Sequence, residues 1–481
     1  AHSLSARRRP MSEGPLGEPS PGLRRRRSWR PILTQAVLLA AWAGSAAAHA
    51  QAGSPPRPTV SRFDEAWAQY CAQNPTEAPP LKCITVGDAL VTLGGDARLR
   101  YEVYDPTNFG RGVQDDDGYL LVRASGHAYV EFSEQWRAFG QVFTANALER
   151  TGGPRPADRN EFDVTQAFVE WRPAEGAFVR FGRQEIAFGA GRLLAASEGS
   201  NVRRQFDGLR AGLRRGDVTY QAVATGLVQV RPGVFDDSAS VDRAVFGIGA
   251  VQSTPSGDIT AAYLIGARRP ERVFGAPAAI QDRVTLGGRV VRQSEQGWLG
   301  ELEVIGQSGE AGGLDIQAWA VAGEVARTTS VGDVQLRYAL RFSAASGDRD
   351  PNDQSLNGFD PLFPNPTYTG AIPLISPTNT LAFNPRLTAS WPSNLRVTGD
   401  VAFIERLEED DRVYAFSGLP IATQAGSGDD VGRLWSLSVS RPVTARWAAS
   451  TTYAYFDAGD YFVGSPDADT HFLTANLTYQ Y

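Results

Sequence analysis

Lysine and methionine are almost missing from this chain of 481 residues, with Lys82 and Met11 as the only examples. Both are common helix formers, so their scarcity gives no support to a helical protein. After residue 52 no apolar run reaches the roughly 20 residues that a membrane-spanning helix needs. The 4 histidines are scattered, and there is no GxSxG, HExxH or P-loop motif. We therefore expect neither a helical membrane protein nor an enzyme.

Cysteine is limited to Cys71 and Cys83. In an exported protein an even pair indicates a disulfide, and two free thiols are the alternative. A bond that closes so short a loop stabilises the fold by roughly 3 kcal/mol on the loop-entropy model. Two cysteines and four scattered histidines offer too few ligands for a metal site, so we expect no metal and no other cofactor.

Positive charge is not in excess either. The formal net charge is −6 and the isoelectric point is near 5.5, which argues against nucleic-acid binding. Glycine and aromatic residues are plentiful, with 50 Gly, 23 Phe and 15 Tyr. This composition is typical of a strand-rich chain with tight turns.

The first 52 residues have the composition of a disordered leader followed by a cleavable signal peptide. The arginines of 24–27 precede an apolar segment from Ile32 to Gly44, and small residues at Ala48 and Ala50 fit a signal-peptidase site. Residues 53–88 are rich in proline and contain the cysteine pair. We expect this second segment to be a periplasmic lead-in fixed by the disulfide.

From Leu93 onward the hydrophobic pattern has a period of two. In 97–104 the apolar residues alternate with Arg98, Arg100 and Glu102, and the same alternation recurs near residues 120, 336 and 475. Alternate residues of a strand face opposite sides of a sheet. A soluble sandwich also alternates in this way. The export signal, the aromatic residues near strand ends and the long polar loops favour a transmembrane barrel instead.

Residues 89–481 are therefore predicted to form an all-β, transmembrane antiparallel barrel of about 18 strands. A closed sheet of this kind leaves no unpaired edge in lipid, and 16–18 strands are wide enough for an aqueous channel. The longest loop, from Ser346 to about Thr380, is expected to be extracellular or to fold into the pore. The predicted strands are 93–104, 118–132, 135–147, 162–172, 177–185, 206–214, 217–228, 242–253, 258–267, 282–292, 298–307, 315–327, 333–344, 380–391, 395–405, 430–440, 445–456 and 470–481.

Arginines on the polar side of the strands are the candidate functional residues. An arginine that faces lipid at mid-depth costs about 2–4 kcal/mol, so these side chains should point into the lumen. There they either form an anion-selective surface or pair with carboxylates and brace the wall. They are Arg98, Arg100, Arg123, Arg180, Arg210, Arg214, Arg337, Arg341 and Arg396.

Two segments resemble the alginate-export porin family. The first runs from Phe181-Gly182-Arg183-Gln184 through Gly191-Arg192-Leu193 to the run Asn201-Val202-Arg203-Arg204-Gln205-Phe206-Asp207-Gly208-Leu209-Arg210. The second joins Ser346-Gly347-Asp348 to the run Phe359-Asp360-Pro361-Leu362-Phe363-Pro364. The resemblance extends over residues 84–481.

The resemblance implies a monomeric, 18-stranded barrel in the outer membrane of a Gram-negative bacterium. It also implies an electropositive constriction that passes an anionic uronate polymer, lined by Arg183, Arg192, Arg204, Asp207 and Arg210. An uptake porin for small anionic or sugar nutrients is the alternative, and a barrel enzyme or adhesin is a third. The expected partners are membrane lipid, an anionic polysaccharide or solute, and the assembly machinery that would recognise Tyr481. No nucleic acid is expected.

Overall fold

The computed structural model describes residues 55–56, 58–59, 61–74, 79–115, 117–365, 370–421, 428–465 and 468–481. The predicted leader and signal peptide lie outside the described residues. No helix in the described part of the chain is both long and apolar enough to cross a membrane.

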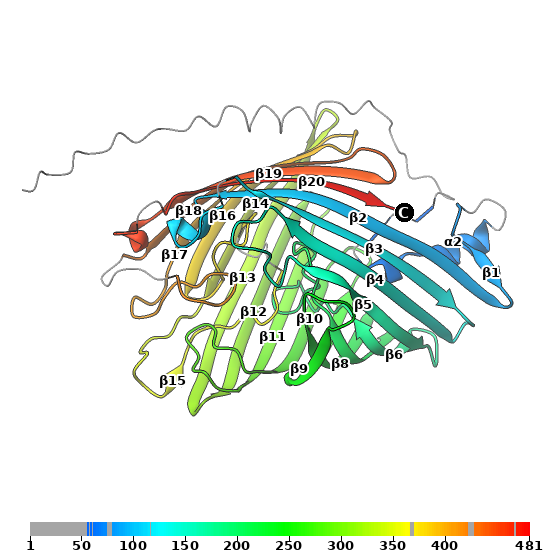
Figure 1. The fold of residues 1–481 in the computed structure, drawn as a ribbon, viewed down its shortest axis with the longest axis horizontal. Coiled ribbons are helices and arrows are strands. Elements are labelled where there is room, and N and C mark those ends of the chain that lie inside the picture. The colour runs from blue at the N-terminus through cyan, green and yellow to red at the C-terminus, as the bar shows by residue number, and fades with distance from the viewer. Residues whose placement is uncertain are drawn as a thin grey trace, which may run out of the picture. The chain divides into compact units, whose positions relative to one another are not determined.

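The described residues form one sheet of 20 strands, drawn in Figure 1. Two of these are side additions, because β1 (Ile84–Val86) pairs only with β2 and the two-residue β15 (Ser355–Leu356) only with β13. The remaining 18 strands form the wall, as the sequence predicted. They are β2 (Ala89–Asp105), β3 (Tyr119–Glu131), β4 (Trp136–Leu148), β5 (Asn160–Trp171), β6 (Ala177–Gln184), β7 (Phe206–Arg215), β8 (Val218–Gln229), β9 (Ser238–Ser253), β10 (Ile259–Arg269), β11 (Gln281–Gln293), β12 (Trp298–Ala311), β13 (Leu314–Val331), β14 (Val334–Ala345), β16 (Thr380–Ser390), β17 (Arg396–Glu405), β18 (Asp430–Pro442), β19 (Trp447–Ala458) and β20 (Thr470–Gln480).

Each wall strand pairs antiparallel with its neighbours in the chain, and the last closes on the first. The closing pair is β2 with β20, from Asp96 opposite Gln480 to Asp105 opposite His471. At one end of the barrel the connections between strands have two to five residues, and we call it the short-turn end. The opposite, long-loop end carries the three longest connections, which are residues 185–205, 346–379 and 406–429.

The two faces of the wall differ in the way that the alternation predicts. One face carries apolar side chains that are open to the surroundings, such as Phe181, which is 68% exposed, and Leu286. Tryptophans lie on this face at strand ends, and Trp136 stacks on Trp171 with ring centroids 6.1 Å apart. An apolar outer band with aromatic residues at its borders suits lipid contact. The prediction of a transmembrane barrel is confirmed.

The other face points into the lumen, and two of the long loops lie against it. Leu194 of loop 185–205 forms a bridge with Phe363 of loop 346–379. Together they bury a cluster with lumen-facing residues such as Tyr263 and Ile265 of β10. Since the outer face meets lipid, the main buried core of this protein lies between the inward loops and the wall. Of the two predicted placements for the longest loop, its described part adopts the inward one.

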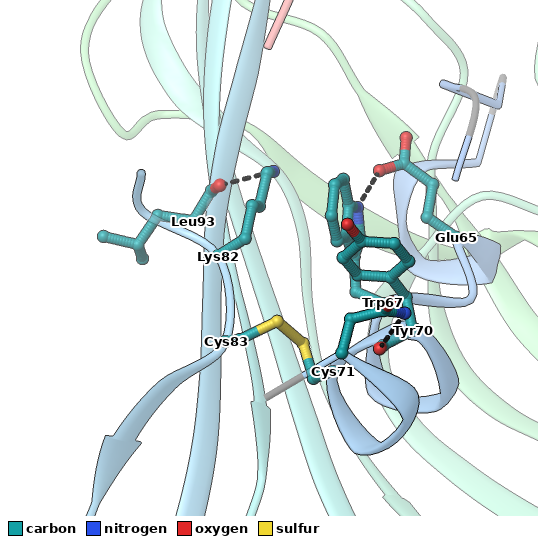
Figure 2. Close-up of a disulfide and its surroundings, with 8 residues drawn as sticks. Glu65, Trp67, Tyr70, Cys71, Lys82, Cys83 and Leu93 are labelled. Carbon is teal, nitrogen blue, oxygen red and sulfur yellow. Dashed lines mark hydrogen bonds between the residues drawn. A yellow bond between two sulfur atoms is a disulfide. The ribbon is translucent and has the colours of Figure 1, made fainter. Parts of the chain in front are cut away.

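The N-terminal lead-in forms a short 3-10 helix η1 (Arg62–Asp64) and the helix α2 (Trp67–Gln73) before β1. In the structure Cys71 and Cys83 are joined by a disulfide, with Cα atoms 5.4 Å apart. Figure 2 shows this bond, with Lys82 reaching from beside it to the carbonyl oxygen of Leu93 at 2.6 Å. The bond therefore ties α2 to the residue before β1, which pairs with the first wall strand β2.

Candidate functional site

Arg98 and Arg100 of β2 are lumen-facing, and loop 185–205 lies on top of them. The Arg98 guanidinium donates to the carbonyl oxygens of Glu198 at 3.0 Å and Ser200 at 2.8 Å, and Arg100 donates to that of Gly199. Carbonyl oxygens are good partners for a buried guanidinium, which has only donors. Both arginines therefore hold the loop against the wall in this structure.

Glu198 brings three arginines together at the loop tip. Its carboxylate lies 2.8 Å from Arg123 of β3, 3.0 Å from Arg203 and 3.9 Å from Arg98. Burial favours the neutral acid, but Arg203 and Arg123 outweigh burial and hold the pKa of Glu198 below its usual value. Arg203 also binds Glu185 at 2.6 Å, and burial raises the pKa of that carboxyl to about 7 despite the pair.

Two further motif residues fix the loop by contacts to backbone. The Asn201 amide donates to the carbonyl oxygens of Val122, Asn146 and Asp158 at 2.8–3.1 Å. Arg204 is partly buried and donates to the carbonyl oxygens of Ala195 at 3.2 Å and Phe363 at 2.8 Å. Burial lowers the pKa of Arg204 to about 10. Arg204 thus joins the two inward loops.

The motif glycines permit a close approach of neighbouring strands. Gly182 of β6 pairs directly with Gly208 of β7, at φ of +130° and +151°. A Cβ atom would lie 2.2 Å from the carbonyl oxygen of Ala167 at Gly182, and 2.3 Å from that of Ala224 at Gly208. Only glycine fits both the backbone conformation and the space.

Arg183 and Asp207 form a bidentate pair beside these glycines. The guanidinium donates to the two carboxylate oxygens at 2.8 and 3.1 Å. The pair lies where β6 ends and β7 begins, and Arg183 also contacts Asp163 of β5 at 3.4 Å. A role in lining the pore stays a prediction for this pair.

Three acidic residues next to this pair approach one another. Carboxylate oxygens of Asp163, Asp236 and Asp237 lie within 4.8 Å of each other. Asp163 already accepts from the Asp237 backbone at 3.1 Å and contacts Arg183 at 3.4 Å. These contacts give the cluster a structural explanation, and we assign no metal to it.

The second motif anchors loop 346–379 inside the barrel. Asp360 is 1% exposed and accepts from Arg269 of β10 at 3.0 Å. Gln307 of β12 accepts from the Asp360 N–H at 3.0 Å and donates to its carbonyl oxygen at 2.7 Å. Arg283 of β11 completes the group by donating to Gln307 at 2.8 Å. The sequence reasoning did not select these wall residues, although Arg269 and Arg283 follow the lumen-facing alternation.

Arg192 extends from loop 185–205 to the wall on the side of β12. It pairs with Glu301 at 2.7 Å and with Glu303. Arg289 of β11 also binds Glu301, at 3.1 Å. This is a mixed cluster of arginines and carboxylates that face the lumen.

A second mixed cluster lies on β13 to β17. Arg337 and Arg341 of β14 both approach Glu324, the latter at 4.0 Å, and Arg386 of β16 lies 3.5 Å from Asp400. The side chains of Arg341 and Arg386 are 24% and 25% exposed, more than Arg98 or Arg123. Arg341 interacts electrostatically with both Arg386 and Arg192. Arg386 was not selected from the sequence, although its alternation phase would have shown it.

The remaining arginines lie toward the short-turn end. Arg180 binds the buried Glu170 at 2.6 and 3.0 Å, and Arg210 donates to Gln221 at 3.3 Å. Arg214 donates to the turn carbonyl of Gly216 at 3.3 Å, and Arg396 begins β17 in an exposed position. The predicted arginines therefore do not form one ring. They divide between loop anchors, the two mixed clusters and this end of the barrel.

Solved porins have a similar fold. OccAB1 of Acinetobacter baumannii is 12% identical with a TM-score of 0.55, over 82% of this chain and 97% of that one. A BenF-like porin of Pseudomonas fluorescens Pf-5 is 11% identical with a TM-score of 0.57, over 81% and 98%. OpdK of Pseudomonas aeruginosa is 11% identical with a TM-score of 0.52, over 81% and 98%. At such low identity the likeness shows a shared barrel fold.

Sequence comparison gives the family. A search of the curated proteins finds no match. The family model described as alginate export matches residues 89–476, from the start of β2 into β20. An export family and a porin-type barrel indicate an outer-membrane channel. The chain belongs to the alginate export family.

Proposed function

We propose that this channel passes an anionic polysaccharide, such as an alginate-like uronate polymer, or related anionic solutes through an arginine-lined pore. The support is the composition of the lumen-facing strand positions, where arginines outnumber carboxylates. The arginines are Arg98, Arg100, Arg123, Arg137, Arg180, Arg210, Arg214, Arg243, Arg269, Arg283, Arg289, Arg337, Arg341, Arg386 and Arg396, and the carboxylates are Asp96, Glu102, Glu131, Asp163, Glu170, Glu301, Glu303, Glu324 and Asp400.

The observation that carries the proposal is the grouping of Arg192, Arg341 and Arg386. One comes from an inward loop and two from the wall, they are partly open to the lumen, and their charges interact. Positive side chains at a narrow part of a pore favour anions. We therefore assign the constriction to these three residues, with Arg337 and Arg289 beside them.

Carboxylates at the same place suit transport and not tight binding. Glu301, Glu324 and Asp400 each lie within 4.0 Å of one of these arginines. A solute carboxylate would compete with them, which weakens its hold on each arginine. Conduction needs such weak, repeated sites, because a site that binds a polyanion too well blocks the pore.

Four other arginines act on the loop and not on the solute in this proposal. They are Arg98, Arg100, Arg123 and Arg204. They position loop 185–205, which carries Arg192 toward the opposite wall. Their effect on selectivity is then indirect, through the loop. The Arg183–Asp207 pair joins the strands at the base of the same loop and helps to fix its ends, whereas Arg210 lies further along β7, toward the short-turn end.

Uptake of small anionic or sugar nutrients is the alternative function. The two inward loops favour it, because they reduce the free cross-section of the lumen. A solved structure of OpdK with vanillate has a TM-score of 0.50 to this chain, and that ligand belongs to OpdK. Placement in the outer membrane of a Gram-negative bacterium is common to both functions. Recognition of Tyr481 by assembly machinery and a monomeric state stay predictions.

Block of single-channel current by added saccharides tests the proposal. Oligouronates should block at roughly tenfold lower concentration than neutral malto-oligosaccharides of the same length, since about 1.4 kcal/mol of charge attraction gives that factor. Equal block by both would contradict an anionic substrate. Block by a monomeric uronate or another small carboxylate, with none by the oligomer, would favour the uptake function.

A further inference from the structure

The N-terminal segment of residues 61–74 reaches into the barrel. Phe63 is 3% exposed and packs against Tyr129, Phe139 and Phe168, with its ring centroid 4.9 Å from that of Phe168. These three aromatic residues come from the neighbouring strands β3, β4 and β5. Phe63 therefore joins three wall strands that are far from it in the sequence.

The contact lies on the lumen side of the wall. Phe139 pairs with Phe168 in the strand register, and the next pair along, Ala138 with Val169, has the opposite phase. Val169 is exposed on the apolar outer face. Because side chains alternate along a strand, Phe139 and Phe168 point inward, and Phe63 can touch them only from within the barrel.

Charged groups surround the Phe63 ring. The guanidinium carbons of Arg137 and Arg180 each lie 4.4 Å from its centroid, and both arginines bind the buried Glu170. A phenyl ring between two guanidinium groups makes favourable cation–π contacts. The neighbouring Asp64 interacts electrostatically with Arg180 and Arg210. The segment thus covers arginines that would otherwise face the lumen.

Several contacts hold the segment at this end. Arg62 donates to the carbonyl oxygen of Tyr481 at 2.9 Å and pairs with Glu65 at 2.6 Å. Lys82 lies 4.7 Å above the Trp67 ring, and the disulfide joins α2 to the strand start, as Figure 2 shows. All of these contacts belong to the short-turn end, so the segment can leave the lumen without unpairing any wall strand.

We propose that residues 61–74 are a plug, with Phe63 as its tip, that narrows the lumen at the short-turn end of the barrel. The plug covers Arg137, Arg180 and Arg210, and its withdrawal widens the path and returns these arginines to the lumen. The disulfide sets how far the plug can move. This inference concerns the opening of the pore and holds whichever solute passes.

The test is the single-channel conductance of the full-length mature protein in planar bilayers at about 1 M KCl, where charge effects are screened within about 3 Å. Phe63→Ala should raise the conductance by roughly 1.5- to 2-fold, because the aromatic side chain at the tip of the plug leaves a narrow part of the pore. Phe132→Ala is the matched control. Phe132 is an exposed aromatic residue at the short-turn end of β3, and its loss should change nothing.

A second measurement keeps the result interpretable if Phe63→Ala assembles poorly. Reductant added to wild-type channels, and separately the double variant Cys71→Ser/Cys83→Ser, should increase the frequency of a larger-conductance state. Limited proteolysis should then cut the segment while the heat-modifiable barrel band survives. Unchanged conductance in Phe63→Ala and in reduced wild-type channels would overturn the plug, and so would a conductance that falls after the segment is cut.

Discussion

Replacing Arg341 and Arg386 together with glutamate is expected to lower the anion-to-cation permeability ratio by roughly tenfold or to reverse it, with conductance retained. Two unit charges 4 Å apart interact by about 1 kcal/mol in water and about 4 kcal/mol at an effective dielectric near 20. Each substitution reverses a charge at the proposed constriction; Asp400 loses Arg386, and Glu324 keeps only Arg337 of its two arginines. A narrow point with an excess of carboxylates favours cations.

Reversal potentials across a dilute salt gradient measure this permeability ratio. The salt is dilute because charges act over longer distances when screening is weak. The matched control is Arg268→Glu, which makes the same change in an exposed ion pair with Asp282 outside the lumen. The control should keep wild-type selectivity. If the double variant also keeps it, Arg341 and Arg386 brace the wall and the constriction lies elsewhere.

Asp360→Ala is expected to release loop 346–379 from the lumen and to cost about 3–5 kcal/mol of stability. Removing one partner of a buried ion pair leaves the other charge without compensation. Here the charges left behind are Arg269 and, one strand further, Arg283, both buried. Denaturant titration of the assembled barrel and proteolysis of the loop measure the two effects.

Asp353→Ala is the control for this change, because Asp353 lies in the same loop but is exposed, and its carboxylate accepts from the backbone N–H of Ser355. It should behave like the wild type. An Asp360→Ala variant with a protected loop and unchanged stability would show that the apolar contacts of Phe359 and Phe363 suffice to dock the loop.

The strands were predictable because a lipid-facing wall imposes a period of two on the sequence itself. Every wall strand lies where the alternation placed it, to within a few residues. The pore-lining role that the motif resemblance implies for Arg183 stays a prediction.

The inward loops were not predictable in this way. Arg98 meets the carbonyl oxygen of Glu198, about a hundred residues away, and Arg204 meets that of Phe363, which is further still. A backbone carbonyl leaves no trace in the identity of the residue that supplies it. The contact of Phe63 with the wall could not be predicted either. Its partners on β3 to β5 are lumen-facing aromatic residues, and nothing in their sequence positions indicates that Phe63 packs against them. The period-two alternation shows that an arginine side chain faces the lumen. It does not show which loop residues cover that side chain.

The sign of the wild-type reversal potential across a dilute KCl gradient tests the central claim, an arginine-governed anion preference, most directly. Screening is weakest under these conditions, so the charge of the lumen has its greatest effect. We expect chloride to be clearly more permeant than potassium, with the preference fading as salt rises. A cation preference, or no preference at the lowest salt, would contradict an anion-selective pore.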